Sequence, residues 1–109
     1  MSAYNTVKSE QVCRSCGNIV TLAIQFKYGE VRQYEYQIGD QLTWGGNDID
    51  IPGQRRVVLD AAAEACGICG AEGLDYEVYL ENDRIISVKP FSGKYDFVGR
   101  QESYIVLEK

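Results

Sequence analysis

Two short stretches decide the fold of this chain: Cys13-Arg14-Ser15-Cys16-Gly17 and Cys66-Gly67-Ile68-Cys69-Gly70. In each stretch two residues separate the cysteines, so both sulfurs can face one point around a tight turn. The glycine that follows can adopt a positive φ, which turns backbone amides toward the thiolates. Two such turns, called the two knuckles below, supply four sulfurs in a tetrahedron. The sequence therefore predicts one metal site formed by Cys13, Cys16, Cys66 and Cys69.

The donor set favours a structural ion over a catalytic one. The chain contains no histidine, whereas a catalytic zinc keeps an open position and usually has histidine or carboxylate among its ligands. Four thiolates close the coordination shell, so we expect structural Zn²⁺. Two alternatives stay open. Four cysteines in two knuckles also suit iron in a rubredoxin-like site. Cys13 and Cys16 could instead form a redox pair, with Arg14 lowering a thiol pKa, although redox motifs usually open a helix.

The two knuckles resemble those of the zinc-ribbon group, in which two such turns at the tips of β-hairpins hold one zinc ion. Each knuckle is followed by a predicted strand, as in that group. The chain departs from the pattern in two respects. Arg14 and Gly67 stand where a proline is common, and 49 residues separate Cys16 from Cys66, against about 15–20 in the compact pattern. The longer gap leaves room for an inserted hairpin and loop.

Alternating hydrophobic residues predict strands on both sides of the second knuckle. Between residues 19 and 28 every second side chain is apolar, and a similar alternation returns over 31–38. We expect these two segments to form a hairpin joined at Gly29-Glu30. Beyond the second knuckle, residues 75–81 and 84–88 flank Asn82-Asp83, which predicts another hairpin.

The remaining segments complete a mainly β architecture with little helix. Residues 55–59 and 103–107 are prone to form strands. Ala61–Ala65 is ambiguous between an extended strand and one turn of helix. The predicted fold class is mainly β, with antiparallel β-hairpins around a zinc-ribbon-like site of four cysteines. We expect one zinc-stabilised β domain over 1–109, with knuckles at 13–17 and 66–70, the inserted hairpin and loop in 19–65, and C-terminal strands in 74–107.

Negative charge is concentrated in the middle of the chain. The net charge of −5 divides into +1 over residues 1–39, −8 over 40–83 and +2 over 84–109. Such a field repels nucleic-acid phosphates and attracts basic partners. The tyrosines of the predicted strands are interleaved with acidic and amide residues, and no basic stripe accompanies them. Composition therefore argues against a nucleic-acid-binding protein.

The sequence contains no nucleophile elbow, phosphate loop or other catalytic motif, so we expect a protein that is not an enzyme. The first residues show no apolar signal region, and no apolar run approaches the roughly 20 residues of a membrane span. We therefore expect a cytoplasmic protein, and in that reducing compartment paired cysteines are typical of metal ligands or redox groups rather than of structural disulfides.

The function that we expect from the sequence is a protein-binding module with a structural zinc. A specific form is a bacterial immunity protein that neutralises a basic toxin domain, since such inhibitors are similarly small, acidic and without a catalytic constellation. The alternatives are a nucleic-acid-associated zinc ribbon and a thiol redox or electron-transfer protein. The candidate partner-binding residues are a tryptophan beside flexible glycines and five acidic residues: Trp44, Asp48, Asp50, Asp60, Asp75 and Glu77.

Overall fold

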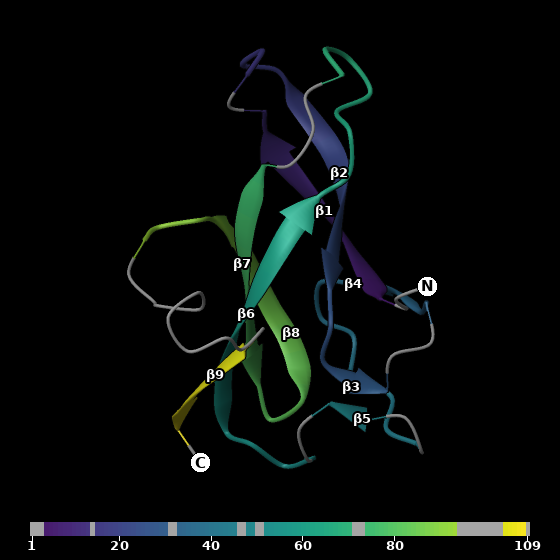
Figure 1. The fold of residues 1–109 in the computed structure, drawn as a ribbon, viewed down its shortest axis with the longest axis vertical. Helices are drawn as coiled ribbons and strands as arrows, with labels where there is room; N and C mark the ends of the chain where they lie inside the picture. Colours follow the sequence, from purple (N-terminus) through teal and green to yellow (C-terminus); the bar gives the residue numbers. More distant parts are fainter. Residues whose placement is uncertain are drawn as a thin grey trace.

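The fold is built from strands, seven of which form one strongly curled sheet (Figure 1). The computed structural model describes residues 4–13, 15–30, 33–45, 48–49, 52–70, 74–93 and 104–108, and these contain no helix. The large sheet has the order β4-β1-β2-β6-β7-β8, and β9 also pairs with β6. A second, two-stranded sheet joins β3 to β5. The strands are β1 (Asn5–Val12), β2 (Ile19–Phe26), β3 (Gly29–Glu30), β4 (Glu35–Gln37), β5 (Asp48–Ile49), β6 (Arg56–Ala63), β7 (Asp75–Glu81), β8 (Arg84–Pro90) and β9 (Tyr104–Glu108).

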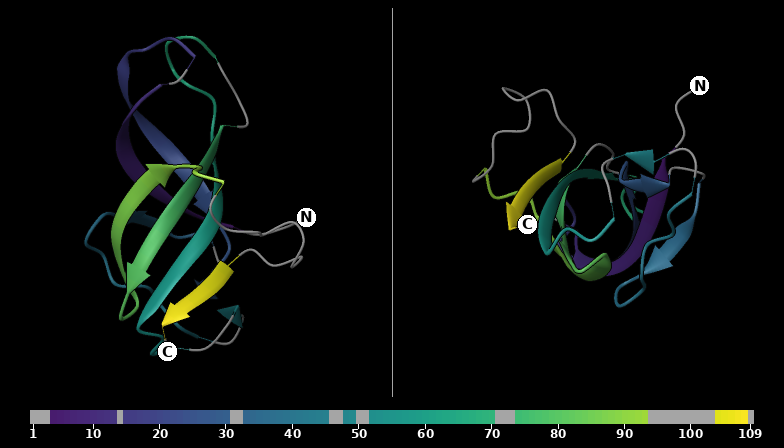
Figure 2. Two further views of the ribbon diagram at one scale, coloured as in Figure 1. Left: turned by 90° about the vertical axis from the view of Figure 1, so that its left-hand side faces the viewer. Right: turned by 90° about the horizontal axis from the view of Figure 1, so that it is seen from below.

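Hydrogen bonds join the two ends of the large sheet and give it the shape of a barrel (Figure 2). The segment 39–42 follows β4 and runs beside β8. The N–H of Gly39 donates to the carbonyl of Ile85 over 2.7 Å. The side-chain amide of Gln11, on β1, donates to the carbonyl of Val88, on β8, over 3.0 Å. Closing a sheet in this way removes most of its exposed edges.

The side chains inside the barrel are among those that the alternation predicts. Tyr28 and the apolar residues of β2 at positions 22, 24 and 26 are 2 % exposed or less, and so are Tyr76, Val78 and Leu80 of β7. The mainly β fold class and the buried faces of these segments are therefore confirmed. The core of buried apolar residues also includes two cysteines, and its members from β1, β2 and β6 are Val7, Leu22, Ile24, Phe26, Val57, Leu59, Ala61 and Ala63.

The hairpin predicted between residues 19–28 and 31–38 is wrong. β2 pairs instead with β1, antiparallel over eight residues from Ile19 to Phe26. β4 lies on the other side of β1 and runs parallel to it, while Gly29-Glu30 forms β3 rather than a turn. The alternation identified which side chains are buried, but a buried face does not specify which strand lies alongside.

The strands predicted over 55–59 and 75–88, and the hairpin formed by the latter, are confirmed. β7 and β8 form the expected hairpin, and Asn82 and Asp83 at its turn have φ values of 51° and 66°. Positive φ at both central residues gives the turn whose twist matches that of the strands. The ambiguous alanine segment is extended, because β6 continues through Ala63. The terminal strand predicted over 103–107 corresponds to β9, which begins and ends one residue later. No helix in the described part of the chain has the length and hydropathy needed to cross a bilayer.

A buried asparagine ties the start of β1 to the segments around β3. Asn5 is fully buried. Its side-chain amide donates to the carbonyls of Tyr28 and Glu30 over 3.2 and 3.0 Å, and its side-chain oxygen accepts from the N–H of Tyr34 over 3.1 Å. A buried polar group is tolerated in a core when its partners are satisfied in this way.

Replacing Asn5 by alanine should lower the free energy of unfolding by about 2–4 kcal/mol, because the backbone groups that it satisfies would stay buried without a partner. Urea unfolding followed by tryptophan fluorescence measures this. The control is Gln37→Ala, which removes an exposed amide from β4 and should change stability by less than about 0.5 kcal/mol. Equal effects of the two substitutions would contradict a structural role for the Asn5 network.

Candidate metal centre

Both knuckles lie at the same end of the barrel, although 49 residues separate them in sequence (Figure 1). The first knuckle connects β1 to β2, and the second lies in the connection between β6 and β7. Each therefore occupies the tip of an antiparallel pair of strands. The two pairs are neighbours because β2 lies beside β6. The predicted placement of the knuckles at hairpin tips is confirmed.

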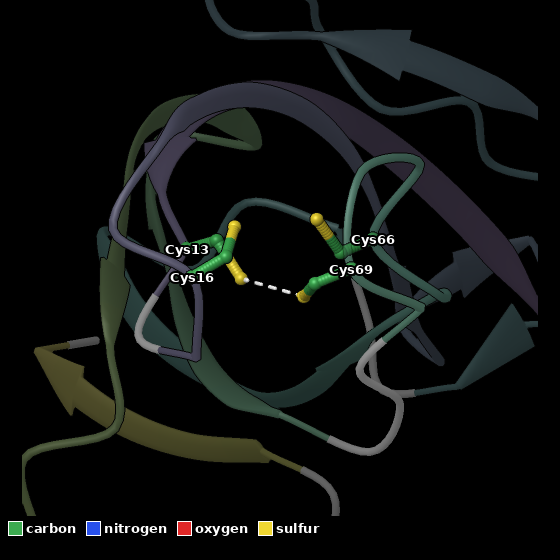
Figure 3. A group of neighbouring side chains, drawn as sticks. All are labelled: Cys13, Cys16, Cys66 and Cys69. Carbon is green, nitrogen blue, oxygen red and sulfur yellow. Dashed lines mark hydrogen bonds between the residues drawn. The ribbon is translucent and has the colours of Figure 1, made fainter.

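The four cysteine sulfurs converge on one point (Figure 3). All four Sγ atoms lie within 4.8 Å of one another. The Sγ atoms of Cys13 and Cys69, which come from different knuckles, are 3.7 Å apart. Four sulfurs at a Zn–S distance of about 2.3 Å in a tetrahedron are separated by about 3.8 Å. The arrangement could therefore hold one metal ion, as the sequence predicts.

The two knuckles share one backbone geometry, as their common sequence pattern indicates. Gly17 and Gly70 have φ values of 76° and 74°. The N–H of Gly17 donates to the carbonyl of Cys13 over 2.7 Å, and that of Gly70 donates to the carbonyl of Cys66 over 2.9 Å. The positive φ predicted for both glycines is confirmed. A residue with a Cβ would be strained at either position.

Backbone amides near the sulfurs favour the thiolate form that a metal requires. The N–H groups of Cys69 and Ile68 lower the pKa of Cys66 to about 7, against the opposing effect of its burial. The backbone N–H of Asn18, followed by its side-chain amide, lowers the pKa of Cys16. Asn18 is a contributor that the sequence analysis missed. A polar residue directly after the CxxCG pattern is the signal that could have identified it.

Burial divides the four ligands into an inner pair and an outer pair. The first cysteine of each knuckle belongs to the hydrophobic core: Cys13 is fully buried and Cys66 is 3 % exposed. The second cysteine is more accessible, since Cys16 is half-buried and Cys69 is exposed. One side of the cluster is thus anchored in the barrel interior and the other faces solvent.

The boundary between β2 and β6, called the seam below, lies between the two knuckles and contains few backbone pairs. β1 and β2 share eight residue pairs and β6 and β7 share seven, but β2 and β6 share only Ile24↔Ala63 and Gln25↔Ala62. Two further hydrogen bonds cross the same boundary: the N–H of Glu64 donates to the carbonyl of Ala23 over 2.9 Å, and the side-chain amide of Gln25 donates to the carboxylate of Glu64 over 3.2 Å. An ion held by all four sulfurs would therefore join the two hairpins beside the β2–β6 ladder, where few residues are paired.

Three of the candidate partner-binding residues share the outward face of the barrel wall. Asp60 on β6 is the cross-strand partner of Glu77 on β7, and Asp75 is the partner of Ala62, two residues further along β6. Residues opposite one another, or two apart, project from the same face. Burial, then the charges of Asp75 and Glu77, raise the pKa of Asp60.

Glu77 differs from its neighbours because its carboxylate is enclosed. It is 1 % exposed and accepts hydrogen bonds from the hydroxyl of Tyr79 over 2.9 Å and from the hydroxyl of Ser92 over 3.0 Å. The N–H of Ser92 also donates to it over 3.4 Å. In this structure Glu77 therefore links β7 to the segment after β8 and presents no free carboxylate at the surface.

Trp44 packs against the main core. It is half-buried, and its ring meets that of Tyr28 edge-on with centroids 5.6 Å apart. Its indole Nε1 is buried and has no acceptor among the described residues. The backbone of Asp48 lies in β5, but its side chain, and all of Asp50, fall outside the described residues. The structure thus groups Asp60, Asp75 and Glu77 on one face of the wall and packs Trp44 against the core.

No family model, curated protein or solved structure matches this chain. The resemblance to the zinc-ribbon group therefore rests on the two knuckles and on the strands that follow them.

The inner and outer cysteines should respond differently to substitution. Without metal, Cys13→Ser should destabilise the chain by about 1–3 kcal/mol, because it places a hydroxyl in the core, whereas Cys69→Ser at the exposed position should change stability little. With Co²⁺ as a probe, either variant should lose about a quarter of the thiolate-to-cobalt absorption, because three sulfurs remain.

The control for both measurements is Ser15→Ala, which changes an exposed knuckle residue that carries no sulfur. It should retain the full absorption. An unchanged cobalt spectrum in Cys13→Ser or Cys69→Ser would show that the altered sulfur is not a ligand.

Proposed function

We propose that this chain is a zinc-stabilised, non-catalytic module that binds a basic protein partner. The observation that carries the metal part of the proposal is the convergence of all four sulfurs within 4.8 Å. An all-thiolate set leaves no open position on the ion, which is the arrangement of structural zinc sites. The two knuckles would hold the ion, and its binding energy would add to the free energy of folding.

The position of the sulfurs in the fold favours a structural metal over a redox pair. A redox CxxC pair usually lies at the start of a helix, where the helix N-terminus lowers a thiol pKa. Here each pair lies at the tip of two strands, and the described residues contain no helix. Iron would fit the same four sulfurs, and its colour would distinguish it at once from colourless zinc.

The purified protein should contain one zinc ion per chain. Removal with a strong chelator should lower the midpoint of thermal unfolding by more than about 10 °C, because the ion joins the two hairpins across their short seam. Metal analysis of the colourless protein and calorimetry with and without chelator measure both quantities. A red protein would support the iron alternative, and a metal-free protein of unchanged stability would contradict the structural role.

The partner is inferred from charge. The chain carries a net charge of −5, and four thiolates with one Zn²⁺ make it more negative by a further two charges. Such a field speeds association with a basic protein and disfavours nucleic acid. The specific form of an immunity protein bound to a toxin domain stays a prediction, since no matching protein supports it.

Immobilised zinc-loaded protein should retain a basic protein from the native host at low salt. The apparent affinity should fall by at least about tenfold between about 50 and 500 mM NaCl, because charge pairing at an exposed interface is screened. Binding measured with the isolated partner checks this. Retention of nucleic acid in place of protein would support the zinc-ribbon alternative, and salt-independent retention would contradict the electrostatic basis of the proposal.

A further inference from the structure

A hollow of about 420 Å³ opens in the barrel wall between β2 and β6. Its volume is in the range of sites that accept a small molecule or one large side chain. The residues around it come from the segment before β1, from the end of β2 and the residue after it, from the second half of β6 and from the start of β7: Tyr4, Gln25, Phe26, Lys27, Asp60, Ala61, Ala62 and Asp75.

The hollow lies where the strand next to β6, on the side away from β7, changes from β2 to β9. β2 pairs with β6 up to Ala62, and β9 pairs with it from Leu59 toward Arg56. Among the described residues, neither register reaches Asp60 or Ala61 from that side. Alanine is depleted in strands, yet β6 carries three in succession. At Ala61 and Ala62 the short side chains leave the wall thin, which accounts for the space.

Apolar and charged groups are arranged on different parts of this hollow. Phe26 and Ala61 belong to the barrel core, and Ala62 adds a third apolar residue to the lining. Asp60 and Asp75 contribute carboxylates from the outward face, and Lys27 contributes one positive charge directly after β2. The carboxylate of Asp60 is partly buried beside two further acidic groups, and this surrounding raises its pKa. A cation placed between Asp60 and Asp75 would relieve that repulsion.

We propose that this hollow is the site where the partner inserts one basic side chain, an arginine or a lysine, with its aliphatic stem over Ala61 and Ala62 and its charged group between Asp60 and Asp75. The proposal rests on the proposed protein-binding function and assigns a surface to it. A basic side chain matches the lining because it combines an apolar stem with a cationic end. Arginine fits best, since its planar guanidinium can donate to two carboxylates at once.

The test uses the full zinc-loaded chain and a blocked tripeptide, acetyl-Gly-Arg-Gly-amide, in place of the unidentified partner. Amide chemical shifts of the ¹⁵N-labelled protein should change saturably at Gln25, Ala61 and Ala62. The same peptide with citrulline, which keeps the shape but lacks the charge, should bind about tenfold more weakly. Asp60→Asn and Asp75→Asn should each weaken the arginine peptide by about two- to fivefold.

Two further variants test whether peptide binding depends on the hollow itself or only on the negative charge of the chain. Ala62→Leu should block the hollow and abolish the shifts without loss of charge. Glu10→Gln removes an exposed carboxylate of β1 that does not line the hollow, and it should leave binding unchanged. If Ala62→Leu fails to fold, the two asparagine variants still decide the proposal.

The outcomes distinguish this proposal from the function on which it rests. Charge-dependent shifts on another face would contradict the proposal that the hollow is the binding site, but they would still support a basic partner. Absence of charge-dependent binding, together with salt-sensitive retention of a basic partner, would overturn the hollow alone. Absence of both would overturn both proposals. Equal binding of the arginine and citrulline peptides would show that the site does not recognise a cation.

Discussion

The barrel depends on how its two best-formed hairpins are held together. β1–β2 and β6–β7 are each extensively paired, whereas the ladder between β2 and β6 contains only two residue pairs. The four cysteines lie at the end of that seam, two on each hairpin. Core packing holds the seam together below, and a metal ion bound by the four sulfurs would hold it at the tip. The inner cysteines, Cys13 and Cys66, belong both to the core and to the candidate ligand set.

The local parts of the structure were predictable, and the long-range ones were not. Each knuckle is five residues long and contains its own turn chemistry, so its geometry follows from sequence alone. The β7–β8 hairpin is similarly local, with its turn at Asn82-Asp83. In contrast, β4 pairs parallel to β1 across some thirty residues, and no local pattern indicates such a partner.

β1 was missed for a different reason. Its inward-facing positions include Asn5 and Ser9, which are buried but polar, so the strand lacks the apolar alternation by which strands are recognised. Its stability comes from hydrogen bonds to distant backbone groups, including the carbonyls of Tyr28 and Glu30. The hollow beside Asp60 was equally hidden, because it depends on where two other strands stop pairing with β6.

The spacing of the knuckles has a consequence for the order in which the protein acquires its structure. Joining Cys16 to Cys66 closes a loop of 49 residues, which costs about 1 kcal/mol more chain entropy than the compact spacing of ribbon-type sites. An unfolded chain thus offers two separate two-sulfur half-sites. The four sulfurs come together only when β2 and β6 have met. A metal ion bound by all four would therefore complete its coordination late, on a barrel that is already assembled, rather than serve as the nucleus around which the chain first collapses.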